Sequence, residues 1–189
     1  MKKASLFLKK FLTQPRKIGA VSSSSKFLTQ KMTSLIPFES IETIVELGAG
    51  TGAITKAIIK RKKKETTLIV FEPDDHFFSF LKEANLQTGK KVILIKDLAE
   101  NLGKVLKSLE VNHPDCIVSS LPFTSLGEKN TTKIFQEIEE NLAPDGHFIL
   151  FQYTPYLFPV LAKHFRIRTL SFVPFNLPPA FVIECALLR

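Results

Sequence analysis

The stretch VELGAGTGAI, residues 45–54, joins an apolar run to a glycine-rich turn and then to a second apolar face. Glycines at 48, 50 and 52 are typical of a loop that follows a strand and opens a helix, because glycine permits sharp turns and close approach of the backbone to a ligand. The dinucleotide pattern G-x-G-x-x-G is absent, and E-x-G-x-G-x-G stands in its place, beginning at Glu46. A glycine-rich turn alone is weak evidence, so its meaning depends on the flanking sequence.

Outward from this turn, the chain alternates strand-like and helix-like segments. The strand-like segments are short apolar runs rich in β-branched residues, at 43–50, 66–73, 91–97, 115–122 and 146–154. Between them apolar residues recur at helical spacing, with charged residues on the other faces. This order predicts a doubly wound α/β fold with a parallel sheet.

The last segment has a different pattern. Residues 165–176 and 178–188 are two strand-like runs, and the connection Asn176-Leu177-Pro178-Pro179 is too short for a crossover helix. We therefore expect an antiparallel hairpin on the sheet edge. The complete prediction is a mostly parallel seven-stranded sheet of the Rossmann-like type with this hairpin at its C-terminal end.

Composition narrows the class of protein. A chain of 189 residues with 44% hydrophobic residues fits one domain with a sizeable core. Cys116 and Cys185 lie in apolar runs, as expected of core residues in a reducing compartment. No apolar run is long enough to span a bilayer, no signal peptide is recognisable, and the histidines lack metal-ligand spacing. We expect a cytoplasmic protein without a metal.

Charge is distributed unevenly along the chain. Residues 1–38 hold eight of the 26 basic side chains and none of the 18 acidic ones, so they account for the net charge of +8. This imbalance indicates an anionic partner, either phospholipid headgroups or nucleic-acid phosphates. We divide the chain into a basic amphipathic helical segment, residues 1–38, and a catalytic domain, residues 39–189. Within the first segment, serines at 22–25 predict a helix over roughly residues 26–35.

Residues 1–17, MKKASLFLKKFLTQPRK, have the profile of a short interfacial helix. Leu8, Phe11 and Leu12 share one helical face, lysines occupy much of the remainder, and Pro15 ends the helix. Such a helix is expected to bind an anionic membrane surface. The alternative is a lid that packs over the cofactor site, and a helix that does both is compatible with the sequence.

An acid after the second strand adds weight to the glycine-rich turn. Glu72 lies about 20 residues beyond Gly52, where a carboxylate can accept hydrogen bonds from both ribose hydroxyls of an adenosine-type cofactor. From about residue 40 onward the sequence resembles the class I S-adenosylmethionine-dependent methyltransferases. The resemblance implies that S-adenosylmethionine is the cofactor. Its methionine amino group would lie near Glu46, and its methionine portion would follow the loop Gly48, Ala49, Gly50, Thr51 and Gly52. Glu72 with Pro73 would hold the ribose, Asp97 and Leu98 would contact the adenine, and Ser119 is a further cofactor-binding residue.

The corner DCIVSSLPFTSL, residues 115–126, separates two relatives within that class. Methyltransferases that act on base amines carry Asn-(Leu/Ile/Pro)-Pro-(Tyr/Phe) here, and Ser120 stands at the Asn position. The rRNA adenine dimethylases share the glycine motif and a similar corner. The sequence resembles bacterial phospholipid N-methyltransferases in more places: QPRKIGAVSSSSKFL (14–28), SSLPF (119–123), FQYTP (151–155) and NLPPAFV (176–182).

The chemistry of the acceptor amine favours a lipid over an adenine as the substrate. An adenine amine is a poor nucleophile and profits from an Asn oxygen, whereas a lipid ethanolamine needs only to lose a proton and to be aligned. We expect Ser119, Ser120, the backbone at Leu121 and Tyr153 to form the catalytic group. Phe123 either packs on a helix or lines the lipid pocket, and Tyr153 also has a purely structural alternative.

The expected activity is N-methylation of phosphatidylethanolamine at the inner face of the membrane, where the enzyme would be peripherally bound; its mono- and dimethyl forms are further candidate substrates. The alternative is an rRNA adenine N6-methyltransferase. RNA dimethylases usually carry a C-terminal helical domain after the sheet, and this chain stops at Arg189, so we expect no nucleic-acid partner. We infer no protein partner. A non-catalytic binding protein with this fold is a third alternative, which the intact glycine motif and Glu72 argue against.

Overall fold

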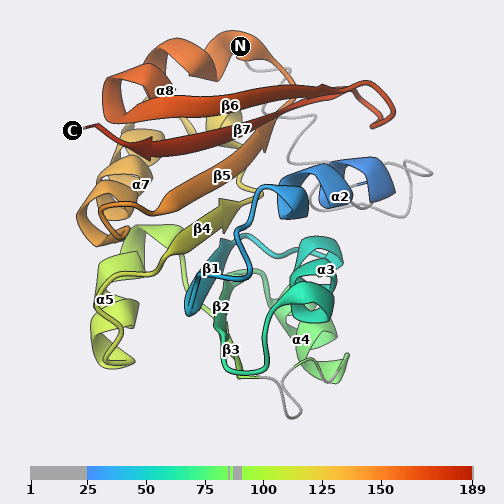
Figure 1. Cartoon of the computed structure of the whole chain (residues 1–189), viewed down its shortest axis with the longest axis vertical. Coiled ribbons are helices and arrows are strands. Elements are labelled where there is room, and N and C mark those ends of the chain that lie inside the picture. The colour runs from blue at the N-terminus through green and yellow to red at the C-terminus, as the bar shows by residue number, and fades with distance from the viewer. Residues whose placement is uncertain (1–24, 85, 87–90, 189) are drawn as a thin grey trace.

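The apolar runs form strands of one sheet, which a computed structural model describes over residues 25–84, 86 and 91–188 (Figure 1). The strands are β1 (Thr43–Leu47), β2 (Thr67–Phe71), β3 (Val92–Ile95), β4 (Cys116–Ser119), β5 (His147–Gln152), β6 (Phe165–Val173) and β7 (Ala180–Leu187). Their order across the seven-stranded sheet is β3-β2-β1-β4-β5-β7-β6. Strands β1 to β5 run parallel, which confirms the predicted doubly wound sheet.

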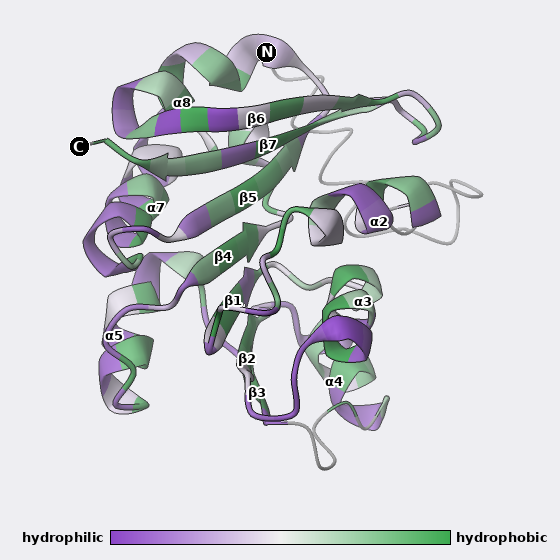
Figure 2. Ribbon diagram, viewed as in Figure 1, coloured by the Kyte–Doolittle hydropathy of each residue, from purple (hydrophilic) through white to green (hydrophobic). Residues whose placement is uncertain are grey.

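Helices cover both faces of the sheet because the strands carry apolar side chains on both faces. On one face lie α2 (Lys26–Ser34), α3 (Ala53–Arg61) and α4 (Asp75–Glu83). On the other face lie η1 (Ala99–Asn101), α5 (Leu102–Ser108), α6 (Phe123–Leu126), α7 (Glu128–Asn141), η2 (Pro155–Leu157) and α8 (Phe158–His164). Figure 2 shows hydrophobic residues concentrated in the strands and polar residues on the outward faces of the helices.

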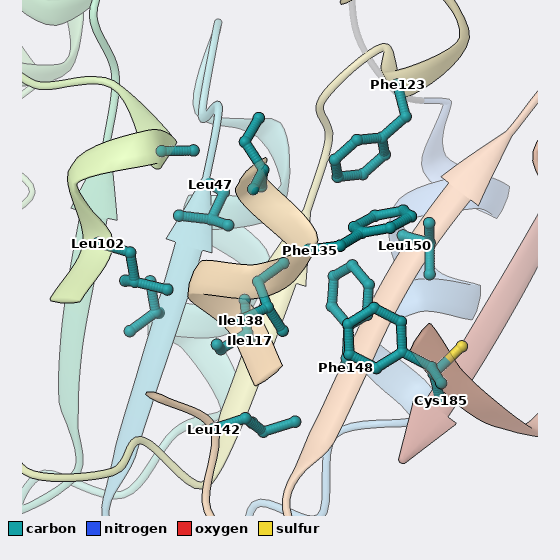
Figure 3. Packing of buried hydrophobic residues seen from close by; sticks show 14 of the residues in the cluster. Leu47, Leu102, Ile117, Phe123, Phe135, Ile138, Leu142, Phe148, Leu150 and Cys185 are labelled. Carbon is teal, nitrogen blue, oxygen red and sulfur yellow. The ribbon is translucent and has the colours of Figure 1, made fainter. Parts of the chain in front are cut away.

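An aromatic cluster fills the core on the second face. Phe123 is buried and its ring lies 4.9 Å from that of Phe135 and 6.5 Å from that of Phe148 (Figure 3). Of the two alternatives for Phe123, the structure therefore supports packing on a helix. Cys116 and Cys185 are free and buried, as core residues should be.

The predicted helix after the serines is α2. The Oγ atom of Ser25 accepts a hydrogen bond from the backbone N–H of Leu28 at 3.2 Å, which is an N-cap. Leu28 and Met32 are buried against the same face of the sheet as α3. The described part of segment 1–38 thus packs into the core on this face of the sheet, while residues 1–24, with the expected interfacial helix, lie outside the described residues.

The expected C-terminal hairpin is formed by β6 and β7. Strand β7 is antiparallel to both of its neighbours, β5 and β6, so β6 becomes the outer edge of the sheet. Residues 174–179 join the two strands. Because Phe181 pairs with Gln152, this connection lies near the carboxyl end of β5.

Candidate active site

The carboxyl ends of the parallel strands bring the predicted site residues together. The strand order reverses between β1 and β4, which is where ligands bind in open α/β sheets. Backbone hydrogen bonds continue one residue past the strands: Gly48 N–H donates to Phe71 O at 2.9 Å and Ser120 N–H to Leu47 O at 3.0 Å. Gly48 and Ser120 therefore emerge side by side at the same edge.

The glycine-rich loop follows β1 directly. Gly48 and Gly52 have φ of +77° and +73°, in the left-handed region that favours glycine. A Cβ atom on Gly48 would lie 2.8 Å from Cδ2 of Leu121, and one on Gly52 would lie 2.6 Å from Cδ2 of Leu81. The glycines thus let the loop lie tightly against the β4 corner and α4, leaving backbone exposed to a ligand.

The carboxylate of Glu72 ties this loop to the end of β2. Its Oε2 accepts from Gly50 N–H at 2.6 Å and its Oε1 from Asp74 N–H at 3.0 Å. Burial raises the pKa of Glu72, and these two N–H groups oppose the rise. Each oxygen has a further lone pair, so the group can still accept hydrogen bonds from a ligand.

A cavity of 280 Å³ opens beside Glu72. Eight of the predicted site residues line it: Gly48, Gly50, Glu72, Pro73, Asp97, Leu98, Ser120 and Leu121. Several other residues that line it are apolar, among them Phe77, Pro122 and Leu126. An apolar cavity with few polar groups is the usual form of a small-molecule site.

Asp97, which also lines the cavity, is held in place by local hydrogen bonds. Its Oδ1 accepts from Leu98 N–H at 2.7 Å and from the side-chain amide of Asn101 at 2.6 Å. These donors lower the pKa of Asp97, with the Asn101 amide contributing most. Leu98 beside it is half exposed and offers an apolar surface on which a flat ring can pack.

Six of the predicted residues do not line this cavity: Glu46, Ala49, Thr51, Gly52, Ser119 and Tyr153. Ser119 is fully buried, and its Oγ accepts from Leu121 N–H at 3.2 Å. Tyr153 follows β5, where it is 36% exposed and packs edge-on against Phe151. Ser119 thus braces the corner from inside, and Tyr153 lies apart from the cavity at the same edge of the sheet.

Glu46 is buried beneath the glycine loop in β1. Neither carboxylate oxygen has a hydrogen-bond partner among the described residues, and the same is true of the Thr55 hydroxyl. Burial raises the pKa of Glu46 to about 7 and the negative charge of Glu72 adds to this rise, while the nearby hydroxyl and N–H of Thr55 on α3 oppose it although their geometry falls short of a hydrogen bond. A buried carboxylate with unused acceptors is costly to the fold, and such a residue suits a site that receives a cationic group.

Several residues of the site were missed by the sequence reasoning, among them Asp74, Phe77 and Gln152. Asp74 caps α4 by accepting from the N–H groups of His76 and Phe77, and both Asp74 and Phe77 line the cavity. An acid just before a helical pattern is an N-cap signal and marks where α4 starts at this edge. Gln152 is buried and donates from its side-chain amide to Leu121 O at 3.4 Å; no motif marks it.

Comparison with known proteins gives the family. The model of the family described as "Methyltransferase domain" matches residues 44–146. The chain belongs to the class I S-adenosylmethionine-dependent methyltransferases. This methyltransferase is 32% identical, over 98% of its length and 96% of the relative, to the ornithine lipid N-methyltransferase of Singulisphaera acidiphila. It is also 32% identical to the ribosomal RNA small subunit methyltransferase A of Bacillus pumilus, but over 58% of its own length and 36% of that protein.

A solved structure confirms the fold. The methyltransferase aligns with the N-methyltransferase NodS of Bradyrhizobium japonicum WM9 in complex with S-adenosyl-l-homocysteine, with a TM-score of 0.70, 12% identity and 98% coverage of both chains. The cavity fits S-adenosylmethionine, the cofactor of this family. Three features meet there: the glycine loop, where a Cβ atom on Gly48 would fill space, the carboxylate of Glu72, which can accept hydrogen bonds, and a largely apolar wall.

The described residues contain neither a cluster of metal ligands nor a helix suited to crossing a membrane. In residues 25–84, 86 and 91–188, no three His, Cys, Asp or Glu side chains gather as metal ligands would. Over the same residues, no helix has the length and hydrophobicity to cross a membrane.

Proposed function

We propose that this methyltransferase methylates the primary amine of a membrane lipid. The observation that carries the proposal is the 32% identity to an ornithine lipid N-methyltransferase along almost the whole of both chains. Ornithine and ethanolamine headgroups both present a primary amine near an anionic group, so they require similar chemistry. We propose phosphatidylethanolamine and an ornithine lipid as the two candidate substrates.

The cofactor would occupy the cavity in the orientation that its polar groups favour. Glu72 would accept hydrogen bonds from the ribose hydroxyls, Asp97 and Leu98 would contact the adenine, and the loop Gly48–Gly52 would follow the methionine portion. Glu46 beneath the loop would face the methionine ammonium. When bound, S-adenosylmethionine supplies a methyl group on a cationic sulfur, which a neutral amine can attack.

The β4 corner would receive the amine. Ser120 lines the cavity next to Gly48, whereas Leu121 O already accepts from Phe123 N–H at 3.0 Å and from the Gln152 side-chain amide at 3.4 Å. A lipid amine that has lost a proton to solvent would donate to the Ser120 hydroxyl and be held in line with the methyl group, and such positioning supplies much of the barrier reduction in group transfer. Tyr153, which follows the neighbouring strand β5 at the same edge of the sheet, would hydrogen-bond to the headgroup outside the cavity.

An rRNA adenine remains the second candidate because rRNA methyltransferases are among the relatives. The corner argues against it. Ser120 has a short hydroxyl where base methyltransferases carry an Asn, so the adenine amine would lose its principal side-chain acceptor.

Expression in bacterial cells that contain phosphatidylethanolamine but no methylated lipid tests the proposal. Mass spectrometry of the extracted lipids should show species heavier by one or more methyl groups, and a strain that also makes ornithine lipid shows which headgroup is preferred. Cells that express Glu72→Ala at the same level are the control and should show little product. Unchanged lipids in cells whose rRNA gains methyl groups would contradict the proposal.

A further inference from the structure

The connection between β6 and β7 presents its apolar residues to the outside. Phe175 and Leu177 are 75% and 74% exposed, whereas Asn176 between them is 4% exposed. Loops usually show the reverse, because polar side chains are solvated at no cost and large apolar ones are not. The inverted pattern needs an explanation beyond folding.

Hydrogen bonds of Asn176 hold this arrangement in place. Its side-chain amide donates to Pro178 O at 2.7 Å, and its Oδ1 accepts from Ser25 N–H at 3.1 Å. The second bond joins the hairpin to the residue that caps α2. The apolar side chains are therefore carried on a loop that is fixed to the rest of the fold.

Further exposed aromatic rings flank the connection on the two faces of the sheet, Phe27 on the face that α2 covers and Phe172 on the face that α8 covers. The ring of Phe27 on α2 lies 5.4 Å from that of Phe175, and the ring of Phe172 on β6 lies 5.2 Å from that of Phe181. Phe27 and Phe172 are 55% and 57% exposed. We call the four exposed residues Phe27, Phe172, Phe175 and Leu177 the tip surface. Single exposed apolar residues are normal, but a group of this kind marks an interaction site.

The tip surface lies near the carboxyl ends of the parallel strands, where the active site is also found. Strand β7 starts beside the end of β5, as the pairing of Phe181 with Gln152 shows, and β5 is parallel to β4 and β1. Asn176 also lies close enough to Tyr153 for its side chain to lower the pKa of the Tyr153 hydroxyl, against the larger effect of burial. Figure 1 shows the hairpin tip and α2 projecting on the same side of the molecule.

Charge indicates what the tip surface contacts. The segments that build it, α2 and residues 170–181, contain no acidic residue, and α2 carries Lys26 and Lys31; Arg166 and Arg168 lie at the other end of β6, beside the amino end of β5, and take no part in it. Exposed apolar groups on segments whose charges are all positive suit an anionic bilayer, in which the rings enter the interface and the bases meet headgroups. Tyr156, 82% exposed after β5 at the same edge, is of the residue type enriched at headgroup depth.

We infer that the tip surface docks the enzyme on the bilayer, so that the cavity edge faces the lipid amines. This inference rests on the proposed function, and it assigns membrane contact to described residues separate from the predicted helix at residues 1–17. A second copy of the chain is disfavoured as occupant because two basic surfaces would repel each other. Residues 1–24 are disfavoured as a segment that covers the tip surface, because their charged side chains are all basic and would repel the lysines of α2.

Vesicle sedimentation of the full chain, with S-adenosylhomocysteine added, tests the docking. Vesicles of phosphatidylcholine and phosphatidylglycerol contain no primary amine, so the assay does not depend on methyl transfer. Phe175→Ser with Leu177→Ser should lower the partition onto vesicles at least tenfold. The matched control, Phe80→Ser with Leu188→Ser, removes the same residue types at sites 43% and 54% exposed elsewhere and should change it less than twofold. Equal partition of the tip variant and wild type would overturn the inference.

A fluorescence measurement keeps the test independent of how well the serine variant folds. The chain has no tryptophan, so Phe175→Trp introduces a single reporter, with Phe80→Trp as its control. Brominated lipids should quench the indole introduced at position 175 and leave the one introduced at position 80 unquenched. Lack of quenching at position 175, or a wild-type dimer in gel filtration that the tip variant dissociates without loss of vesicle binding, would contradict docking.

Failure of the proposed function gives a different result. Short-chain phosphatidylethanolamine below its micelle concentration reports methylation without a bilayer, and the tip variant should methylate it at the wild-type rate. If wild type methylates no lipid amine in either form, the proposed function is wrong, whatever the vesicles show.

Discussion

The carboxylate of Glu72 accepts a 2.6 Å hydrogen bond from the backbone N–H of Gly50. The acid at the end of β2 and the loop after β1, far apart in the chain, are thereby fixed as one wall of the cavity. This contact joins two sequence motifs into one wall of the cavity in which we propose that the cofactor binds.

Replacing Glu72 with Ala should weaken binding of S-adenosylhomocysteine by tenfold or more. The ribose hydroxyls would lose charge-assisted hydrogen bonds of about 1.5 to 3 kcal/mol, and Gly50 would lose its anchor. Titration calorimetry measures the effect. Glu83→Ala, an exposed acid at the end of α4, is the control and should bind normally; an unchanged affinity in Glu72→Ala would return that carboxylate to a structural role.

A methyl group on Gly48 should destabilise the fold through one identifiable contact. Gly48→Ala places Cβ 2.8 Å from Cδ2 of Leu121 and adds backbone strain at φ +77°, and we expect a loss of about 2 to 4 kcal/mol. Urea unfolding measures it. Adding Leu121→Ala removes the clash, so the double variant should lose less than the two single variants combined. Strict additivity would show that Leu121 is not the obstacle.

The buried Glu46 predicts a pH dependence of stability. Its folded pKa of about 7 lies above the ordinary 4.5, so between these values the folded state binds more protons than the unfolded state. The contribution of Glu46 therefore destabilises the fold increasingly as pH rises through this window, by a total of about 3 kcal/mol. Urea unfolding from pH 5 to 8 should show that the free energy of unfolding of Glu46→Gln rises relative to that of wild type as the pH increases. Parallel curves would mean that the pKa of Glu46 is not raised.

Tyr153→Phe should lower turnover on short-chain phosphatidylethanolamine while the affinity for S-adenosylhomocysteine stays the same, if the hydroxyl orients the amine. Tyr156→Phe, on a residue 82% exposed, is the matched control and should leave turnover on this substrate unchanged. The same turnover for both variants would assign Tyr153 a packing role only.

Much of the site was predictable because parallel strands end at one edge. Gly48, Glu72, Asp97 and Ser120 each follow a recognisable apolar run, so the fold class alone requires them to converge. The hairpin was predictable for a similar local reason, since the connection at Asn176 is too short for a helix.

Burial and side-chain direction were not predictable in the same way. Ser119 and Ser120 are equivalent in the sequence, yet Ser119 braces Leu121 from inside while Ser120 lines the cavity, because neighbouring residues at a strand end face opposite ways. Gln152 contacts Leu121 from a strand that follows it by about thirty residues, and nothing local marks such a pair. The tip surface was also hidden, because two of its members, Phe27 and Phe175, meet only in the fold.

The most direct measurement gives the purified enzyme S-adenosylmethionine labelled on its methyl group together with three substrates in parallel: phosphatidylethanolamine vesicles, ornithine lipid vesicles and undermethylated ribosomal RNA. The account predicts label in the amine of at least one lipid, none in RNA, and a loss of lipid labelling in Glu72→Ala. Label that enters RNA while both lipids stay unlabelled would contradict it.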